Sequence, residues 1–329
     1  MSKDTAGSAS FQGKILSSQI QKLLAGKRIF LTGGTGLFGK WLLTALQETG
    51  TELVLLTRNP EAFRNSFSMV DSMAVQFLNG DVRDFEFPKG HFDYCIHAAT
   101  PVVSDDLSNA EDELTTIIIE GTRRVLEFVR SADVGRMLYL SSGAVYGVQP
   151  PELEHIPETF PCNPVTAYGR GKLRAERLCL ESGLDCVIAR CFAFVGPLMP
   201  LNAHFAIGNF IGNCLRNEPI VIKGDGTAMR SYMYATDLTE WLLTILLKGS
   251  KKEAYNVGSM DNISIGNLAN KVRHLASGQN EIKISLPPDR FKEPDRYIPC
   301  VKKAEYGLFL EIKYDLNRAI STTLNNITI

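Results

Sequence analysis

The sequence predicts an α/β protein with a doubly wound parallel sheet and a smaller C-terminal α/β lobe. From Lys27 onward, short apolar runs alternate with longer amphipathic stretches, which is the pattern of strand–helix–strand units in a parallel sheet. The chain has 329 residues, of which 44% are hydrophobic, enough to bury a large shared core. A glycine-rich turn also follows the first apolar run, where such a sheet passes into its first helix.

Each expected element is identified by the period of its apolar residues. Apolar runs of strand length cover 28–33, 52–58, 74–82, 92–99, 136–142, 184–192, 218–224 and 253–259. Amphipathic stretches of helical length cover 15–24, 37–50, 113–131, 167–182, 204–215 and 235–249. Strands and helices alternate as far as residue 192, so this part of the chain is expected to form the parallel sheet.

The regular alternation ends near Gly196 and Pro197. Three parts are therefore expected, with the two larger ones closing over a cleft. They are an N-terminal extension with a short amphipathic helix at 1–25, a sheet domain at 26–192 plus about 228–256, and a substrate lobe at 193–227 and 257–329.

Composition excludes several functions. The net charge of −1 and the sequence pI of about 6.5 provide no basic field for nucleic acid or an anionic membrane. No uncharged apolar run reaches the ~20 residues that a membrane span needs, and the N-terminus lacks an apolar secretory segment. The seven cysteines are scattered without a C-x-x-C pair, which favours free thiols over a metal site or disulfides. These features predict a cytoplasmic protein.

The segment LTGGTGLFGKWL carries three glycines at G-x-x-G-x-x-G spacing between the first expected strand and its helix. Glycine permits a tight turn and lets a pyrophosphate approach backbone N–H groups at the positive end of the helix. Because the motif lies at the junction that it requires, it predicts a dinucleotide cofactor and a Rossmann-type sheet. The expected cofactor contacts here are Gly33, Thr35, Gly36, Leu37, Phe38 and Gly39.

The second expected strand ends in LLTRNP, with Arg58 where an NAD-binding unit usually carries an acid for the ribose 2′-hydroxyl. An arginine can bind the 2′-phosphate of NADP through charge-assisted hydrogen bonds worth roughly 1.5–3 kcal/mol. The sequence therefore favours NADP, with NAD as the alternative. After the third strand, Asp81 and Val82 are expected to contact the cofactor, Asp81 by accepting from the adenine amino group. An Asx turn is the alternative role for Asp81.

The segment AYGRGKL places Tyr168 and Lys172 four residues apart in an expected helix, so both side chains share one face. A tyrosine with a pKa near 10 must have it lowered by about 3 to act as a base at neutral pH. One nearby cation lowers a pKa by about 1–3. Lys172 is thus expected to lower the pKa of Tyr168, and a positively charged nicotinamide could complete the change.

With these motifs, the chain resembles the extended short-chain dehydrogenase/reductase family, in its nucleotide-sugar epimerase/dehydratase branch. The resemblance runs from Lys27 to about Leu310 and includes TGGTGLFG, GDV, HAAT, SSGAVYG, YGRGK, GDGTAMRSYMYATDL and YNVGS. It implies an NAD(P)-dependent enzyme acting on a nucleotide-diphosphate sugar. It also implies a homodimer formed through the helices expected at 113–131 and 167–182.

The resemblance implies roles for individual residues. Ser142 would hydrogen-bond the C4 oxygen of the sugar, and Tyr168 would exchange a proton with that oxygen. Lys172 would hold the nicotinamide ribose. Further cofactor contacts are implied for Ala98, Ala99 and Thr100. Substrate contacts are implied for Ser142, Gly143, Asn202, Asn209, Arg230 and Arg296.

The two arginines also suit a diphosphate on physical grounds, because a planar guanidinium binds phosphate through two parallel hydrogen bonds. For Arg296, a surface ion pair with Asp295 or Glu293 is the alternative.

The positions after Ser142 depart from the pattern that the resemblance suggests. Dehydratases of this kind carry an Asp-Glu pair there, and decarboxylases keep a glutamate, whereas this chain has Gly143 and Ala144. Neither residue can move a proton through its side chain. Dehydration is therefore not expected, and decarboxylation loses most of its support.

Two reactions at C4 remain. One is net reduction of a 4-keto-6-deoxy sugar, in which NADPH gives hydride and Tyr168 protonates the new alkoxide. The other is 4-epimerisation with bound NAD. Arg58 favours the reductase, and Ala193 and Ile118, which stand where relatives have asparagine, weaken the epimerase alternative. A non-enzymatic NADP sensor is disfavoured because the serine, tyrosine and lysine are all present.

Overall fold

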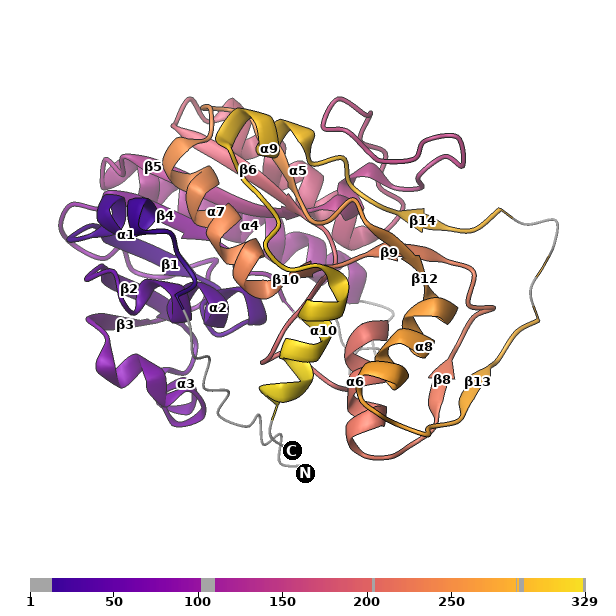
Figure 1. Cartoon of the computed structure of the whole chain (residues 1–329). Helices are drawn as coiled ribbons and strands as arrows, with labels where there is room; N and C mark the ends of the chain where they lie inside the picture. Colours follow the sequence, from indigo (N-terminus) through magenta and orange to yellow (C-terminus); the bar gives the residue numbers. More distant parts are fainter. Residues whose placement is uncertain (1–13, 102–109, 203–204, 288, 290–292, 328–329) are drawn as a thin grey trace.

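A seven-stranded parallel sheet organises the larger part of the molecule (Figure 1). The computed structural model describes residues 14–101, 110–202, 205–287, 289 and 293–327. All strand pairings in this sheet are parallel. In spatial order the strands are β11 (Ala254–Val257), β6 (Cys186–Cys191), β5 (Arg136–Ser142), β4 (Tyr94–His97), β1 (Arg28–Thr32), β2 (Glu52–Thr57) and β3 (Val75–Asn79). The order reverses between β1 and β4, and ligands of such sheets bind beyond the carboxyl ends of the strands at this reversal.

Helices cover both faces of the sheet, because successive side chains of a strand point to opposite sides. Ile29 and Leu31 of β1 enter one core, whereas Phe30 enters the other. The helices of the first core are α1 (Ser18–Leu24), α2 (Leu37–Leu46), α3 (Pro60–Ser66), α7 (Ala235–Lys248) and α9 (Lys302–Leu308). Those of the second core are α4 (Ala110–Ser131) and α5 (Ala167–Glu181).

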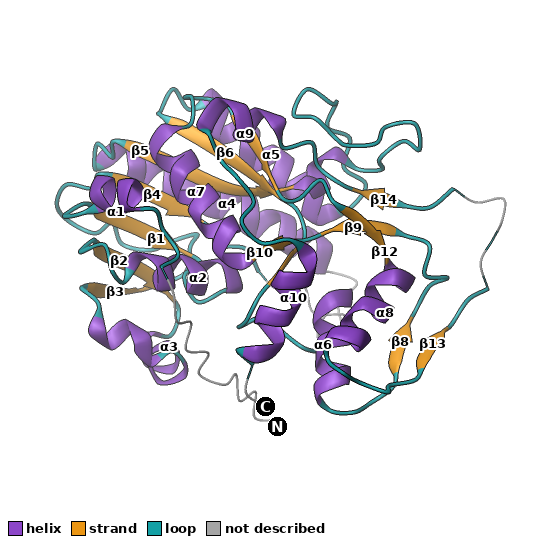
Figure 2. Cartoon of the chain, in the orientation of Figure 1, coloured by secondary structure: helices purple, strands orange, loops and turns teal. Residues whose placement is uncertain are grey.

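A smaller lobe of short strands and helices lies beside the large sheet (Figure 2). Its strand groups are β12 (Asn262–Ser264), β9 (Met229–Ser231) and β14 (Arg296–Tyr297); β13 (Ile282–Ile284) and β8 (Ile220–Ile222); and β10 (Met233–Tyr234) and β7 (Phe194–Val195). Its helices are α6 (Ala206–Leu215), α8 (Ile265–Leu275) and α10 (Leu316–Asn325). A separate core that includes Phe210, Leu268 and Ile320 holds these elements together.

The expected α/β fold with a parallel sheet is confirmed, and each strand and helix expected from the sequence forms over a similar range. The N-terminal helix is shorter than expected: Ile15 and Leu16 are buried before α1 begins, and Leu23 is 43% exposed. Residues 1–13 of the expected extension and His204 lie outside the described residues. Strands of two or three residues, such as β14, are too short to show a period. No described helix is long and apolar enough to cross a membrane.

Candidate active site

Two glycines in the turn after β1 and at the start of α2 lie in close contact with main-chain atoms of neighbouring segments. Gly33 has a φ of +73°, and a Cβ atom there would lie 2.5 Å from the carbonyl carbon of Ala98. A Cβ atom on Gly39 would lie 2.3 Å from the carbonyl oxygen of Gly33. Only glycine fits such contacts and such a φ. The spacing of these glycines therefore lets the ends of β1 and β4 and the start of α2 meet at one point.

The N-terminus of α2 is open at this turn. Its N-cap, Gly36, has no side chain to accept from the first N–H groups, and its own N–H donates to the Gly33 carbonyl at 3.1 Å. Thr35 and Gly36 are exposed, while Leu37 and Phe38 are half-buried. The first N–H groups of a helix have no intrahelical partner and lie at its positive end. These residues can therefore hold the phosphates of a dinucleotide.

A buried histidine supports the loop that follows β4. Thr32 Oγ1 and His97 Nδ1 are 2.7 Å apart, and His97 Nε2 lies 3.1 Å from Thr122 Oγ1. Thr32 Oγ1 also accepts from the Ala99 N–H at 3.2 Å. Burial lowers the pKa of His97 to about 3, so its ring is neutral at pH 7. This network holds the loop of Ala98 and Thr100 beside the glycine turn, and sequence reasoning missed His97 although it begins the HAAT motif.

Arg58 follows the last residue of β2 and is exposed. It lies close enough to Asp81 to contribute to a lowered carboxyl pKa, for which the hydrogen bond from Arg83 is the larger cause. Asp81 Oδ1 accepts from Arg83 Nε at 2.7 Å and from the Arg83 N–H at 3.0 Å. The Asx turn, which was the alternative for Asp81, is thus present, and the carboxylate expected to accept from adenine already has a partner. Val82 packs on α4 beside Gly121.

The expected catalytic side chains converge at the end of β5. Ser142 is the last residue of that strand and is 8% exposed. Tyr168 and Lys172 lie on α5, whose N-cap Thr166 accepts from the Gly169 N–H at 3.0 Å. Ser142 lies close enough to Tyr168 to act on the pKa of its phenol, which it lowers against the larger effect of burial. The structure therefore brings together the serine and tyrosine that the sequence placed on different elements.

Lys172 is buried and directs its ammonium group toward neutral oxygen atoms. Its Nζ donates to Thr100 Oγ1 at 2.7 Å and to the Leu140 carbonyl at 2.8 Å, and lies 5.8 Å from the centre of the Tyr168 ring. Burial lowers the pKa of Lys172 to about 8. Burial also raises the pKa of Tyr168 to about 12, against the smaller and opposite effect of nearby Ser142. Burial is the largest effect on the pKa of Tyr168 and makes the net change a rise, so the lowering expected from Lys172 together with the nicotinamide stays a prediction.

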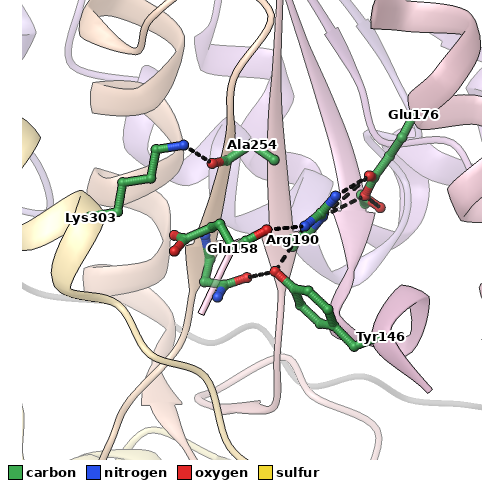
Figure 3. Close-up of polar contacts among 8 residues, drawn as sticks. Tyr146, Glu158, Glu176, Arg190, Ala254 and Lys303 are labelled. Atoms are coloured by element: carbon green, nitrogen blue, oxygen red, sulfur yellow. Dashed lines mark hydrogen bonds and ion pairs between the residues drawn. The ribbon is translucent and has the colours of Figure 1, made fainter. Parts of the chain in front are cut away.

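A second buried cation, Arg190 of β6, is fully paired (Figure 3). Arg190 Nη2 lies 2.7 Å from Glu176 Oε2, and Arg190 Nη1 donates to Tyr146 Oη at 2.9 Å. Ser141 donates to Glu176 Oε1 at 2.5 Å, and Tyr146 donates to Asn256 Oδ1 at 2.8 Å. The network raises the pKa of Arg190 and ties β5, β6, β11 and α5 together. Sequence reasoning missed it, because its members share no motif or spacing.

The side chain of Tyr297 fills the space beside Gly143. A Cβ atom on Gly143 would lie 2.6 Å from Tyr297 Oη and 2.6 Å from Phe192 Cζ. The rings of Phe192 and Tyr297 have centres 4.6 Å apart, and Ser142 lies close enough to Tyr297 to act on the pKa of its phenol. A side chain at position 143 would therefore require the rings of Tyr297 and Phe192 to shift. Tyr297 was also missed from the sequence, although it directly follows Arg296.

Apart from Ser142 and Gly143, the residues expected to contact substrate come from the smaller lobe. Arg230 lies on β9 and Arg296 on the adjacent β14. Arg230 Nη2 donates to Asp295 Oδ2 at 2.6 Å, so the carboxylate suggested as a partner of Arg296 pairs with Arg230 instead. Asn209 is half-buried on α6, and Asn202 is exposed in the preceding loop. Their substrate contacts stay predictions.

Ile118 and Ala193, the two positions where relatives have asparagine, are both at least partly buried. Ile118 is buried between α4 and α5, where a Cβ atom on Gly171 would lie 3.2 Å from its Cδ1. Ala193 is half-buried just before β7. Within the described ranges, no group of three or more His, Cys, Asp or Glu side chains could hold a metal ion, and all seven cysteines are free thiols.

Known proteins share this sequence pattern and this fold. Residues 29–258 match the model of the NAD dependent epimerase/dehydratase family. UDP-glucuronic acid decarboxylase 1 of Xenopus tropicalis is 27% identical over 316 residues, covering 91% of this chain and 72% of the relative. The dTDP-D-glucose 4,6-dehydratase of Homo sapiens is 26% identical over 318 residues, covering 91% and 89%.

A solved structure with the same fold is a UDP-glucuronic acid 4-epimerase variant from Bacillus cereus, in complex with UDP-4-deoxy-4-fluoro-glucuronic acid and NAD. It has a TM-score of 0.78 and 21% sequence identity, covering 91% of this chain and 98% of the other. At this identity, the likeness shows the fold alone.

Proposed function

The chain belongs to the NAD dependent epimerase/dehydratase family, and from this premise we propose that it is an NADP-dependent reductase of a nucleotide-activated 4-keto-6-deoxyhexose. The observation that carries the proposal is that residue 143 is a glycine, and that Tyr297 and Phe192 pack where its side chain would be. The nucleotide-sugar substrate class is supported by relatives that are named for UDP- and dTDP-sugars.

Elimination lacks a proton donor at this site. Dehydration needs an acid to protonate the departing hydroxyl group, and Gly143 and Ala144 offer none. An acidic side chain at position 143 would require the ring of Tyr297 to move, because its Cβ atom would lie 2.6 Å from Tyr297 Oη. Burial raises the pKa of Tyr297 well above that of an ordinary phenol, which makes it a poor substitute for a carboxylic acid. Reaction at C4 without elimination is therefore the chemistry that this site supports.

Reduction requires one hydride and one proton at the C4 carbonyl. NADPH, when bound, supplies the hydride to C4. As the carbonyl π electrons move onto O4, the O–H bond of Tyr168 breaks and its proton passes to O4. Ser142 donates a hydrogen bond to the same oxygen and stabilises its developing negative charge. The ammonium group of Lys172 would hold the nicotinamide ribose and offset the phenolate charge until solvent reprotonates Tyr168.

The protonation state of Tyr168 favours reduction over oxidation. Burial raises its pKa to about 12, so the phenol carries its proton at neutral pH. A reductase begins its cycle with a protonated donor. A 4-epimerase must instead begin by removing the proton of the C4 hydroxyl, which requires the phenolate. The site as it stands therefore suits a proton donor.

The cofactor preference rests on Arg58. We expect its exposed side chain, directly after β2, to bind the 2′-phosphate of NADP, because no acid stands at the end of β2 to bind the free 2′-hydroxyl of NAD. The second candidate is an NAD-dependent 4-epimerase, which is favoured by the NAD found in a 4-epimerase of the same fold.

The first test identifies the dinucleotide and the reaction together. Freshly purified protein is denatured, and the released dinucleotide is identified by mass spectrometry. The proposal expects NADP or an empty site, followed by NADPH oxidation when a nucleotide-linked 4-keto-6-deoxyhexose is added. Stoichiometric NAD or NADH with interconversion of 4-epimers would establish the epimerase instead. Failure to bind either dinucleotide would overturn both candidates.

Arg58 offers a separate test of cofactor choice. Arg58→Gln removes the charge expected to bind the 2′-phosphate, so the Kd for NADPH should rise about tenfold or more while the Kd for NADH stays within twofold. Arg64→Gln is the matched control, because Arg64 is exposed on α3 and pairs with Asp71 at 3.2 Å. Equal losses for NADPH and NADH in Arg58→Gln would remove the argument for NADP.

Tyr168→Phe separates an enzyme from an NADP sensor. Loss of the general acid should lower kcat by about 10²–10⁴-fold and leave the Kd for NADPH nearly unchanged. A sensor would keep its function in this variant. Turnover within threefold of the unmodified protein would remove Tyr168 from the mechanism.

The proposal includes a homodimer formed through α4 and α5, which pack against each other on one face of the sheet. Light scattering of the purified protein measures the mass directly, and a monomer at micromolar concentration would contradict this part of the proposal.

A further inference from the structure

A chain of buried hydrogen bonds runs from α4 through His97 to the loop after β4. Thr122 Oγ1 donates to the Ile118 carbonyl at 2.7 Å and lies 3.1 Å from His97 Nε2. On the other side of the ring, His97 Nδ1 lies 2.7 Å from Thr32 Oγ1, which accepts from the Ala99 N–H at 3.2 Å. The side chains of Thr32, His97 and Thr122 are all buried, so these groups depend on one another for their partners.

The proton count gives this chain a single direction. A threonine hydroxyl has one proton to donate, and Thr122 gives its proton to the Ile118 carbonyl. Thr122 can therefore only accept from the ring, so His97 Nε2 carries the ring proton. Burial keeps the ring neutral, which leaves a lone pair on Nδ1 to accept the proton of Thr32. The lone pairs of Thr32 then face the Ala99 N–H.

The loop that Thr32 holds also carries a partner of the buried lysine. Thr100 directly follows Ala99, and Lys172 Nζ donates to Thr100 Oγ1 at 2.7 Å and to the Leu140 carbonyl at 2.8 Å. An ammonium group has three N–H donors, so two fixed bonds set the direction of the third. If Thr100 moved, the ammonium group would be free to turn about its bond to Leu140. The direction of the third N–H thus depends on the loop.

We propose that His97 is a positioning residue that acts on Lys172 through the loop after β4. Its ring accepts the proton of Thr32 and so fixes Thr32 Oγ1 as the acceptor for the Ala99 N–H, and the loop held in this way presents Thr100 Oγ1 to the ammonium group. This inference rests on the proposed function, because Lys172 holds the nicotinamide ribose there.

Two variants of the same ring separate its two ends. His97→Asn keeps an amide oxygen near the position of Nδ1, whereas His97→Gln keeps an amide nitrogen near the position of Nε2. Because His97→Gln leaves the proton of Thr32 without its acceptor, it should lower kcat/KM by about 5–30-fold. His97→Asn should lower kcat/KM less than threefold. A loss in His97→Asn as large as that in His97→Gln would overturn the proposal.

A double-mutant cycle tests whether the effect passes through Thr100. Thr32→Val and Thr100→Val should each lower kcat/KM by about 5–30-fold. The double variant Thr32→Val/Thr100→Val should be no slower than Thr100→Val. Thr32→Ser keeps the hydroxyl group and should stay within threefold of the unmodified enzyme. A multiplicative loss in the double variant would show that Thr32 acts independently of Thr100 and would overturn the proposal.

Thr239→Val is the matched control for the loss of a buried threonine hydroxyl. Thr239 is buried on α7, where its Oγ1 donates to the Ala235 carbonyl at 2.7 Å. This variant should leave kcat/KM unchanged. If Thr32→Val does not fold, the two His97 variants decide the question.

The pH profile distinguishes positioning from a purely structural role. The bond to Thr100 stabilises the charged form of Lys172, so its loss should lower the pKa of Lys172 below the value of about 8 that burial gives it. In Thr32→Val, the fall of kcat/KM at high pH should therefore move about 0.5–1 pH unit lower. An unchanged profile in Thr32→Val would overturn the link to Lys172, and Thr239→Val should show no change.

The other groups around Lys172 keep their charge over this range. The pKa of His97 is lowered to about 3, and those of Tyr168 and Cys191 are raised to about 12, in each case chiefly by burial. Glu176 is held in its ion pair with Arg190.

A direct measurement separates this inference from the proposed function. If the unmodified enzyme shows no NADPH-dependent reduction, the proposed function fails. The pKa of Lys172 is then followed by ¹³C NMR of lysine side chains, with Lys172→Arg to assign the signal. A lower pKa in Thr32→Val and His97→Gln than in the unmodified protein supports the positioning role, whereas an unchanged pKa in both would overturn it.

Discussion

Lys172 and Arg190 are two buried cations beside the same strand, and they have opposite surroundings. Arg190 is 8% exposed and Lys172 is 2% exposed. Arg190 meets a carboxylate, a phenol and a main-chain carbonyl, from Glu176, Tyr146 and Glu158 (Figure 3). The hydrogen bonds of Lys172 go to a threonine hydroxyl and a main-chain carbonyl, and its Nζ lies 5.0 Å from the centre of the Tyr139 ring. The pKa of Arg190 is accordingly raised, and that of Lys172 is lowered to about 8.

The difference separates a structural charge from a functional one. A buried ion whose counter-ion is in place has its attraction satisfied within the protein. A buried ion without a counter-ion is held at a cost in stability, and it binds an incoming anion or hydroxyl group more readily. The paired cation thus joins β5, β6 and α5, whereas the unpaired one is available for the contacts proposed with the cofactor and with Tyr168.

Removing Arg190 should have the largest effect on stability. Arg190→Met leaves Glu176 buried without its partner, so the free energy of unfolding should fall by about 3–5 kcal/mol, measured by urea denaturation. Arg190→Met/Glu176→Met should lose less than the single variant, because no charge is then left unpaired. Arg123→Met, which breaks an exposed pair with Glu120, is the control and should cost at most about 1 kcal/mol. A loss in Arg123→Met as large as that in Arg190→Met would show that the buried pair is no more important for stability than an exposed one.

Removing Lys172 should instead raise the free energy of unfolding. Its pKa is lowered from 10.5 to about 8 by burial, so between these values the unfolded chain binds more protons and stability rises with pH. Below pH 8 the folded protein keeps the buried Lys172 charged, and the change in pKa corresponds to a loss of about 3 kcal/mol in the free energy of unfolding. Lys172→Met should therefore unfold at higher urea concentration than the unmodified protein at pH 7, while losing most activity. A less stable Lys172→Met protein would show that Lys172 is structural like Arg190.

The activity should depend on pH through Lys172 and not through Tyr168. Lys172 loses its proton as pH rises through about 8, whereas Tyr168 keeps its proton to about 12. We expect kcat/KM for NADPH-dependent reduction to fall about tenfold per pH unit above pH 8, measured by NADPH absorbance. In Lys172→Arg, whose guanidinium stays charged, this fall should move beyond pH 10. A profile that rises with pH would indicate a phenolate base and the epimerase.

Tyr146→Phe should have the smallest effect and sharpen the comparison. It removes the hydroxyl group that Arg190 and Asn256 share but leaves the Arg190–Glu176 ion pair intact. The expected loss in unfolding free energy is about 1–3 kcal/mol, because one acceptor on Asn256 is left buried and unpaired. Urea denaturation of the variant and of the unmodified protein at pH 7 measures this loss. The kcat of the variant should stay within threefold of that of the unmodified protein. A loss as large as that of Arg190→Met would mean that the phenol, not the carboxylate, holds the cation.

Much of the large sheet and part of the site follow from local sequence. Each buried strand and each amphipathic helix has its own period, and the glycine turn and the Tyr168–Lys172 pair depend on spacing within one short segment. The same reasoning did not anticipate the effect of burial on the pKa of Tyr168, because the degree of burial around a phenol depends on side chains from other elements. It also missed His97, whose role appears only when Thr32 and Thr122 lie on either side of its ring.

The sequence by itself determined the family, the parallel α/β fold and the absence of an acid after Ser142, since these are properties of residue type and near-neighbour spacing. Only the tertiary structure decided what occupies the space at Gly143 and which buried cation is paired. Tyr297 reaches that space from a two-residue strand of the smaller lobe. Arg190 meets Glu176 only because β6 and α5 pack together. Contacts between elements far apart in the chain depend on packing geometry, which leaves no periodic signal in the sequence.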